Sequence, residues 1–221
     1  VAFIGATGSG KTTLVSLAAR FYDASSGQVL IDGRDIRDYS FEGLYDRIGY
    51  ITQKAVLFAG NIRDNILFGE STADSSDPSV NKAVALAQAS EFVDSLPEGL
   101  DAPVAQGGTN FSGGQKQRLS IARALARQPE ILIFDDSFSA LDYKTDAKLR
   151  VGLARELAGT TCLIVAQRIG TIRHADRIVV LDEGRAVGIG THDELMKNCP
   201  VYREIAMSQL SPEELGETGG V

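Results

Sequence analysis

A glycine-rich loop between an apolar strand and a helix is the feature that most constrains how this chain can fold. "VAFI" at residues 1–4 has the pattern of a short buried strand, and "KTTLVSLAARFY" at 11–22 has that of a helix. The loop "GATGSGKT" at 5–12 matches G-x-x-x-x-G-K-[S/T], whose backbone N–H groups surround phosphates. A glycine-rich turn with a solvated lysine is the alternative, but it leaves the flanking strand and helix unexplained.

The loop predicts a site for the phosphates of a nucleotide and for Mg²⁺. Glycines let the backbone fold closely around phosphates, and the start of the following helix adds partial positive charge. Lys11 would place a full charge on the β- and γ-phosphates, and the Thr12 hydroxyl would bind Mg²⁺. The residues predicted to bind ATP are Gly5, Thr7, Gly8, Ser9, Gly10, Lys11, Thr12 and Thr13.

Two adjacent carboxylates follow the apolar run "ILIF". Given a phosphate loop, Asp135 at the end of this strand would hold the metal, usually through water. Asp136 would face the γ-phosphate and the attacking water. The alternative is that both acids are turn and cap residues.

The remaining pattern predicts an α/β fold: a P-loop NTPase core with a mixed, largely parallel sheet, an antiparallel β part and an inserted helical subdomain. A hairpin is expected at 27–36 around Asp32-Gly33, and a helical block at 61–128. We expect a disordered tail at 209–221. Further strands are expected at 47–53, 130–135, 161–166 and 177–181, helices within 79–96, 113–128, 143–157 and 168–174, and a hairpin around "DEGRAVG".

Composition excludes some partners and compartments. The formal net charge of −7 argues against nucleic acid as a partner, because phosphate binding by a surface needs clustered Lys and Arg. No apolar run approaches the ~20 residues of a membrane span. Cys162 is expected to be buried and inert and Cys199 to lie in a loop, which suits a reducing compartment. Because Val1 opens directly on a core-type strand, the sequence is predicted to be N-terminally incomplete.

"NFSGGQKQRLSIARAL" at 110–125 resembles the signature sequence of ATP-binding cassette (ABC) proteins, with Phe111 in the usual leucine position. The phosphate loop, Gln53, "ILIFDD" and "SALD" at 139–142 follow the family's order, so the resemblance covers nearly the whole chain, 1–221. "AVLFAGNIRDNILFG" at 55–69 and "GTHDELM" at 190–196 resemble the nucleotide-binding domains of ABC exporters.

The resemblance implies that two such domains close head to tail around two ATP molecules. The signature residues Ser112, Gly113, Gly114 and Gln115 would contact the partner's ATP, and Asp142 would lie in the dimer interface. Gln53 would contact Mg²⁺ or the attacking water and complete a metal set with Thr12 and Asp135. Ser112 is also expected to cap a helix, which is compatible with phosphate binding. Transmembrane domains would lie on the same full-length chain, and this domain would lie at the cytoplasmic face of the cell membrane as part of a transporter.

Besides Phe111, three residues depart from the family pattern. Asp136 stands where the family has glutamate, one methylene longer, and Gln167 stands where it has the switch histidine. Gln106 replaces a glutamate expected to touch the membrane domains. The catalytic set would therefore be Asp136, Gln167 and Gln53, with slow hydrolysis at this site. The pattern resembles the degenerate-site subunit of a heterodimeric exporter, whose signature serves the competent site of a different subunit.

Two other functions remain open from the sequence. One is a regulatory ATP-binding module that does not hydrolyse ATP. The other is a soluble ABC protein of DNA repair or translation, which the acidic composition and the absence of a second cassette or long coiled coil disfavour.

Overall fold

The computed structural model describes residues 1–69 and 77–211. Within these residues a six-stranded sheet has the order β10-β9-β1-β8-β7-β4, and neighbouring strands are parallel except for β10, which is antiparallel to β9. The fold class predicted from the sequence is confirmed. The strands are β1 Ala2–Ile4, β4 Ile48–Ile51, β7 Ile131–Asp135, β8 Thr161–Val165, β9 Ile178–Asp182 and β10 Arg185–Gly190.

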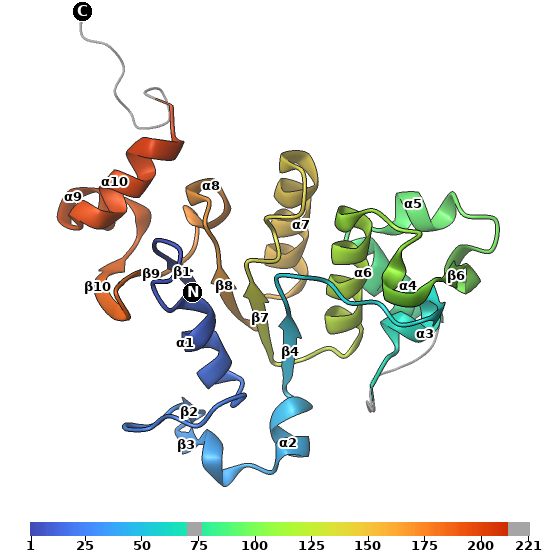
Figure 1. The fold of residues 1–221 in the computed structure, drawn as a ribbon, viewed down its shortest axis with the longest axis horizontal. Helices are drawn as coiled ribbons and strands as arrows, with labels where there is room; N and C mark the ends of the chain where they lie inside the picture. The colour runs from blue at the N-terminus through green and yellow to red at the C-terminus, as the bar shows by residue number, and fades with distance from the viewer. Residues whose placement is uncertain (70–76, 212–221) are drawn as a thin grey trace, which may run out of the picture.

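Helices cover the sheet and extend beyond one of its edges (Figure 1). The helices are α1 Lys11–Ala18, α2 Phe41–Tyr45, α3 Ile62–Ile66, α4 Asp77–Leu86, α5 Ser90–Asp94, α6 Gly113–Ala126, α7 Tyr143–Glu156, α8 Ile169–Ile172, α9 His192–Asn198 and α10 Pro200–Gln209. Short 3₁₀ turns are η1 Ile36–Asp38, η2 Gly99–Asp101 and η3 Gln106–Gly108. None of the described helices is long and apolar enough to cross a bilayer.

The carboxyl ends of the parallel strands meet at one edge of the sheet, where the predicted site residues follow them. Asp135 is paired with Val165 of β8, and Phe3 of β1 is paired with the same valine. In β4, Ile51 is paired with Phe134 of β7. Side chains that are far apart in sequence are therefore brought together by strand register, as expected for ligand sites of open α/β sheets.

The segment between β4 and β7 contains α3, α4, α5 and α6, which lie beyond edge strand β4 (Figure 1). A small antiparallel pair, β5 Gly60–Asn61 with β6 Pro103–Val104, joins them. Their apolar side chains continue the core that includes Leu132 and Phe134 of β7. The helical segment therefore shares a core with the strand that carries Asp135 to the site.

Both predicted hairpins are present. Strands β2 Leu30–Ile31 and β3 Arg34–Asp35 are joined by Asp32-Gly33, with φ of 51° and 79°. Strands β9 and β10 are joined by Glu183-Gly184, with φ of 45° and 76°. Positive φ at both central residues is the conformation that matches the twist of two-residue hairpins.

Two predicted helices were too long, because non-glycine residues adopt positive φ. The helix predicted at 11–22 ends at Ala18, and Arg20 follows with φ 54°. The helical pattern at 79–96 is divided between α4 and α5, and Gln88 between them has φ 57°. Such left-handed residues carry no reliable sequence signal when they are not Gly or Asn.

The C-terminal part differs most from the prediction. Helices α9 and α10 were not predicted, and Cys199, expected in a loop, is 4% exposed at their junction. The disordered tail was predicted to begin at residue 209, but Gln209 is the last residue of α10. Residues 212–221 lie outside the described part of the chain.

Candidate nucleotide site

The phosphate loop connects β1 to α1, and its glycines are required for two different reasons. Gly8 and Gly10 have φ of 82° and 95°, a region that side chains rarely adopt. At Gly5 the obstacle is space, because a Cβ there would lie 2.1 Å from the carbonyl oxygen of Leu181. The shape of the loop therefore depends on its own backbone freedom and on contact with β9.

The ammonium group of Lys11 lies inside this loop. Its Nζ donates hydrogen bonds to the carbonyl oxygens of Gly5 and Ala6, both at 2.8 Å. Burial lowers the pKa of Lys11, while the nearby Asp136 and Asp135 carboxylates oppose that shift. A buried cation held by the main-chain oxygens of a glycine-rich loop is suited to an anionic ligand.

A cavity of about 250 Å³ adjoins the loop. It brings together residues that the sequence analysis assigned to phosphate binding and to hydrolysis. Its lining consists of Thr7, Gly8, Gly10, Lys11, Thr12, Thr13, Gln53, Asp136, Val165 and Gln167. Ser9, within the loop, is buried, and its hydroxyl lies 3.4 Å from the Lys11 Nζ.

Asp135 accepts hydrogen bonds from two hydroxyl groups. Thr12 Oγ1 donates to Oδ1 at 2.8 Å, and Tyr50 OH donates to Oδ2 at 3.0 Å. Burial and the neighbouring Asp135 charge raise the pKa of Tyr50, so its hydroxyl remains a donor. Carboxylate and hydroxyl oxygens are ligands that suit Mg²⁺. The described residues hold no group of three or more His, Cys, Asp or Glu suited to a metal, so water or phosphate oxygens would complete its shell.

Asp136 has a different environment. Its Oδ2 accepts hydrogen bonds from Gln167 Nε2 at 2.7 Å and from Gln53 Nε2 at 3.0 Å. Its backbone has φ 50°, and its N–H donates to the Val165 carbonyl at 3.0 Å. Burial raises the pKa of Asp136, and the Gln167 and Gln53 hydrogen bonds partly oppose that shift. Two amides from distant loops therefore converge on one carboxylate oxygen.

Comparison with known families decides what kind of protein this site belongs to. The sequence profile described as "ABC transporter" matches residues 1–139, which is more than half of the 221 residues. The chain belongs to the ABC transporter family. Domains of this family bind ATP, which agrees with the phosphate loop and the cavity beside it.

Relatives place the chain among exporter-type ABC proteins. It is 46% identical over 219 residues to an ABC transporter ATP-binding protein of Mycobacterium tuberculosis, covering 99% of this chain and 37% of that protein. It is 43% identical over 220 residues to an ATP-dependent lipid A-core flippase of Syntrophus aciditrophicus, covering 100% of this chain and 36% of the flippase. The chain therefore spans little more than a third of the length of these relatives.

A solved structure supports the same assignment. It is described as a bacterial Atm1-family ABC exporter with ATP bound, and it superposes on this chain with a TM-score of 0.89 at 37% identity. The match covers 94% of this chain and 36% of that one. The chain is thus the nucleotide-binding domain of an exporter-type ABC protein.

The ABC signature residues lie at the start of α6, and none of them lines the cavity beside Lys11. Ser112 Oγ accepts from the Gln115 N–H, and Gln115 Oε1 accepts from the Ser112 N–H, so the two form a capping box. The predicted capping role of Ser112 is confirmed. Contact of Ser112, Gly113, Gly114 and Gln115 with a partner's ATP stays a prediction.

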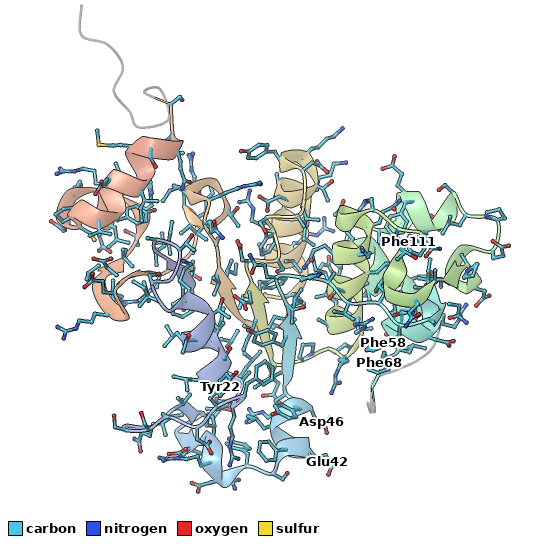
Figure 2. The ribbon with its side chains drawn as sticks, in the orientation of Figure 1. Tyr22, Glu42, Asp46, Phe58, Phe68 and Phe111 are labelled. Carbon is cyan, nitrogen blue, oxygen red and sulfur yellow. The ribbon has the colours of Figure 1, made fainter. Side chains whose placement is uncertain are left out.

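Phe111, the residue that replaces the family's leucine, packs inside the helical segment (Figure 2). Its ring lies 6.2 Å from that of Phe92 in an edge-on arrangement, and the Arg118 guanidinium covers Phe92 at 4.8 Å. The larger side chain is therefore accommodated in an aromatic contact behind the signature.

Asp142 caps α7. Its carboxylate accepts from the Thr145 N–H at 2.9 Å and from the Thr145 hydroxyl at 2.7 Å, and these hydrogen bonds lower its pKa. Its place in a dimer interface stays a prediction.

Two other residues that the sequence analysis considered lie away from the cavity. Gln106 is exposed in a 3₁₀ turn, and the Nδ1 of His192 lies 2.8 Å from the Tyr202 hydroxyl.

Sequence reasoning missed two residues that contact the site residues. Tyr50 lies on β4, and its contact with Asp135 depends on how β4 pairs with β7. Gln209 lies on α10 and contacts the backbone of Gln167. Neither belongs to a local motif, so only the three-dimensional arrangement reveals them.

Proposed function

We propose that this chain is the ATP-binding domain of an ABC exporter whose own site holds ATP and hydrolyses it slowly. The observation that carries the proposal is the pair of amides, from Gln53 and Gln167, on the shortened carboxylate Asp136. The family has glutamate and histidine where this chain has Asp136 and Gln167. A carboxylate that is one methylene shorter is displaced from the attacking water, and misplacement near 1 Å can cost ~10²-fold in rate.

Each residue of the site has a role in binding ATP. Lys11 and the loop N–H groups bind the β- and γ-phosphates. Thr12 and Asp135 hold Mg²⁺, with Gln53 as the further predicted ligand, and the ion neutralises phosphate charge. Gln167 can donate a hydrogen bond to a γ-phosphate oxygen, but an amide neither carries charge nor exchanges protons near neutral pH.

A different subunit is the proposed partner. In a pair of identical chains both sites would have Asp136 and Gln167, whereas the signature "SGGQ" at 112–115 keeps the family's sequence. This signature completes the competent ATP site of a second, non-identical domain. Transmembrane domains on the full-length chain place the assembly at the cytoplasmic face of the membrane, and ATP-driven closing of the two domains powers export.

The steady-state ATPase rate of the full-length complex tests this division of roles. Gly113→Glu introduces a side chain where a Cβ would have no neighbour within 4 Å, so the domain should fold while the partner's site is blocked. Gly113→Glu or Ser112→Ala should abolish most of the activity, whereas Asp136→Asn should cost much less. Ser25→Ala, in an exposed loop, is the matched control for the serine change. If Asp136→Asn is as damaging as the signature changes, the proposal is wrong.

The competing function is a regulatory module that binds ATP without supporting hydrolysis in its complex. It predicts that neither Ser112→Ala nor Gly113→Glu alters the ATPase rate. The same measurement therefore separates the two functions.

A further inference from the structure

The side chain of Gln209, in the last turn of α10, bridges the backbone of the loop that carries Gln167. Its Nε2 donates to the Gln167 carbonyl at 2.8 Å, and its Oε1 accepts from the Ile169 N–H at 2.8 Å. One primary amide thus bonds both the carbonyl group before Arg168 and the N–H group after it. Few side chains can do both, because this needs a donor and an acceptor on one planar group.

Helix α10 is packed into a core, which limits where the exposed Gln209 amide at its end can lie. Tyr202 and Ala206 on its inner face are fully buried in a core with Ile4 of β1 and Val180 of β9. The Tyr202 hydroxyl is also hydrogen-bonded to His192 of α9. Helix α10 lies beside α8, which begins at Ile169 (Figure 1). The Gln209 bridge therefore connects the loop at residues 167–169 to a helix that is packed into the core.

The three residues of this loop are held by three different parts of the molecule. The Gln167 side chain donates to Asp136 Oδ2. Arg168 lies 5.0 Å from the centre of the Tyr143 ring, at the start of α7. Ile169 is fully buried, and its N–H is held by Gln209. Gln209 is therefore the direct connection between the C-terminal helix and the residue at the γ-phosphate side of the site.

We propose that Gln209 is a positioning residue for Gln167, so that the C-terminal helix controls how long ATP stays in this site. The inference rests on the proposed function, since it assumes that Gln167 contacts bound ATP. When the bridge is present, the Gln167 backbone is fixed and its amide stays directed at the site. When the bridge is removed, the loop samples other conformations, and for part of the time the Gln167 amide does not contact the γ-phosphate.

The test is the retention of radiolabelled ATP, loaded with Mg²⁺ into the full-length complex and chased with unlabelled ATP. Gln209→Met keeps a similar volume and removes both hydrogen bonds. It should shorten the retention half-life about tenfold, the scale set by one net hydrogen bond. The rate at which MgATP associates should not change, because Lys11 and its loop are untouched, so the affinity should fall by the same factor as the retention half-life. Gln209→Glu keeps the acceptor, loses the donor and should also shorten retention.

Two controls separate positioning from a general structural effect. Met207→Ala, at an exposed position on the same helix, should leave retention unchanged. In a Gln167→Ala background, Gln209→Met should have no further effect, whereas a structural defect would act regardless of residue 167. Unchanged retention in Gln209→Met, or an equal loss in the Gln167→Ala background, overturns the proposal.

Lys11→Ala distinguishes failure of this inference from failure of the proposed function. Loading is compared in complexes whose partner has lost its own phosphate-loop lysine, so that only this chain's site can bind ATP. If Lys11→Ala complexes then still load and retain ATP, the proposed function is wrong. If Lys11→Ala abolishes loading while Gln209→Met retains ATP normally, only the role of Gln209 is wrong.

Discussion

Asp135 and Asp136 are adjacent in sequence, yet the two sides of the site are held in different ways. Asp135 is the last residue of a central strand and accepts from hydroxyls on α1 and β4, elements packed directly beside it. Asp136 has left-handed backbone and accepts from amides of Gln53 and Gln167, which follow the ends of β4 and β8. The Asp135 side, the proposed metal side of the site, is thus fixed by sheet register, and the Asp136 side, the proposed γ-phosphate side, by loops.

This difference between the two sides indicates where amino-acid substitutions can be tolerated. The Asp135 side is built from residues of β7, β4 and α1, which pack directly against one another, so a change in side-chain size there affects the packing of the sheet. Substitutions on the Asp136 side change only the side chains that the loops direct into the cavity. A chain can therefore lose rapid hydrolysis while keeping ATP binding, which is the behaviour proposed here.

The largest expected effect is on the binding side. Lys11→Ala removes the ammonium group from the loop and should weaken MgATP binding by about a hundredfold, the upper range for a lost charged hydrogen bond. Equilibrium binding to the full-length protein measures this. Lys148→Ala, at an exposed position on α7, is the control. An unchanged affinity for MgATP in Lys11→Ala would mean that Lys11 does not bind the β- and γ-phosphates.

Restoring the γ-phosphate side should have the next largest effect. Asp136→Glu with Gln167→His returns both family residues to an intact phosphate loop. Single-turnover hydrolysis should rise by about tenfold to a hundredfold, provided the partner's signature is serviceable. Each single change should do much less, since residues that act as a unit are not additive.

The measurement needs a complex whose partner has lost its own catalytic glutamate. There the unrestored complex should hold ATP almost unhydrolysed. Fast hydrolysis by the unrestored complex would mean that Asp136 and Gln167 are adequate catalysts. The proposal that this site binds ATP but hydrolyses it slowly would then be wrong.

On the metal side, Tyr50→Phe removes one hydroxyl from Asp135 and keeps the ring that packs on Phe21. The Mg²⁺ concentration needed for half-maximal ATP binding should rise about tenfold, as when a partner of a metal ligand is lost. Tyr39→Phe is the matched control, since Tyr39 OH donates to the Ile31 carbonyl, away from the site. An equal shift in both variants would contradict a specific role for Tyr50.

The smallest effect concerns stability. Because the pKa of Asp136 is raised by burial, its carboxylate costs stability above that pKa, and the cost is relieved as pH falls through it. Asp136→Asn should therefore be more stable than the unaltered protein at pH 7, by roughly 0.5 kcal/mol. The advantage should vanish below the ordinary Asp pKa of about 3.9. Denaturant unfolding in EDTA at several pH values measures it, and a gain independent of pH would point to a different cause.

The phosphate loop and the two carboxylates could be predicted from sequence because each is a local motif with diagnostic flanks. The convergence of Gln53 and Gln167 on Asp136 could not, because it depends on the relative positions of β4, β7 and β8. Tyr50 was missed for the same reason.

Helix α10 was missed although a signal was present. Val201, Tyr202, Ile205 and Ala206 have helical spacing after Pro200 at the first helical position. The polar sequence after residue 208 favoured a disordered tail instead. By contrast, nothing in the sequence marks the left-handed residues Arg20 and Gln88, where packing overrides local preference.

Strand β1 has no partner near it in sequence: Ala2 pairs with Ile164 on one side and Ile178 on the other. The phosphate loop that follows is closed by the β9–β10 turn, where the Gly184 N–H donates to the Ser9 carbonyl at 3.2 Å. During synthesis β1 must therefore wait for β8 before it can pair, and the loop must wait for the β9–β10 turn before it can close. Such non-local closure is slow, so we expect the phosphate loop to reach its closed geometry late in folding.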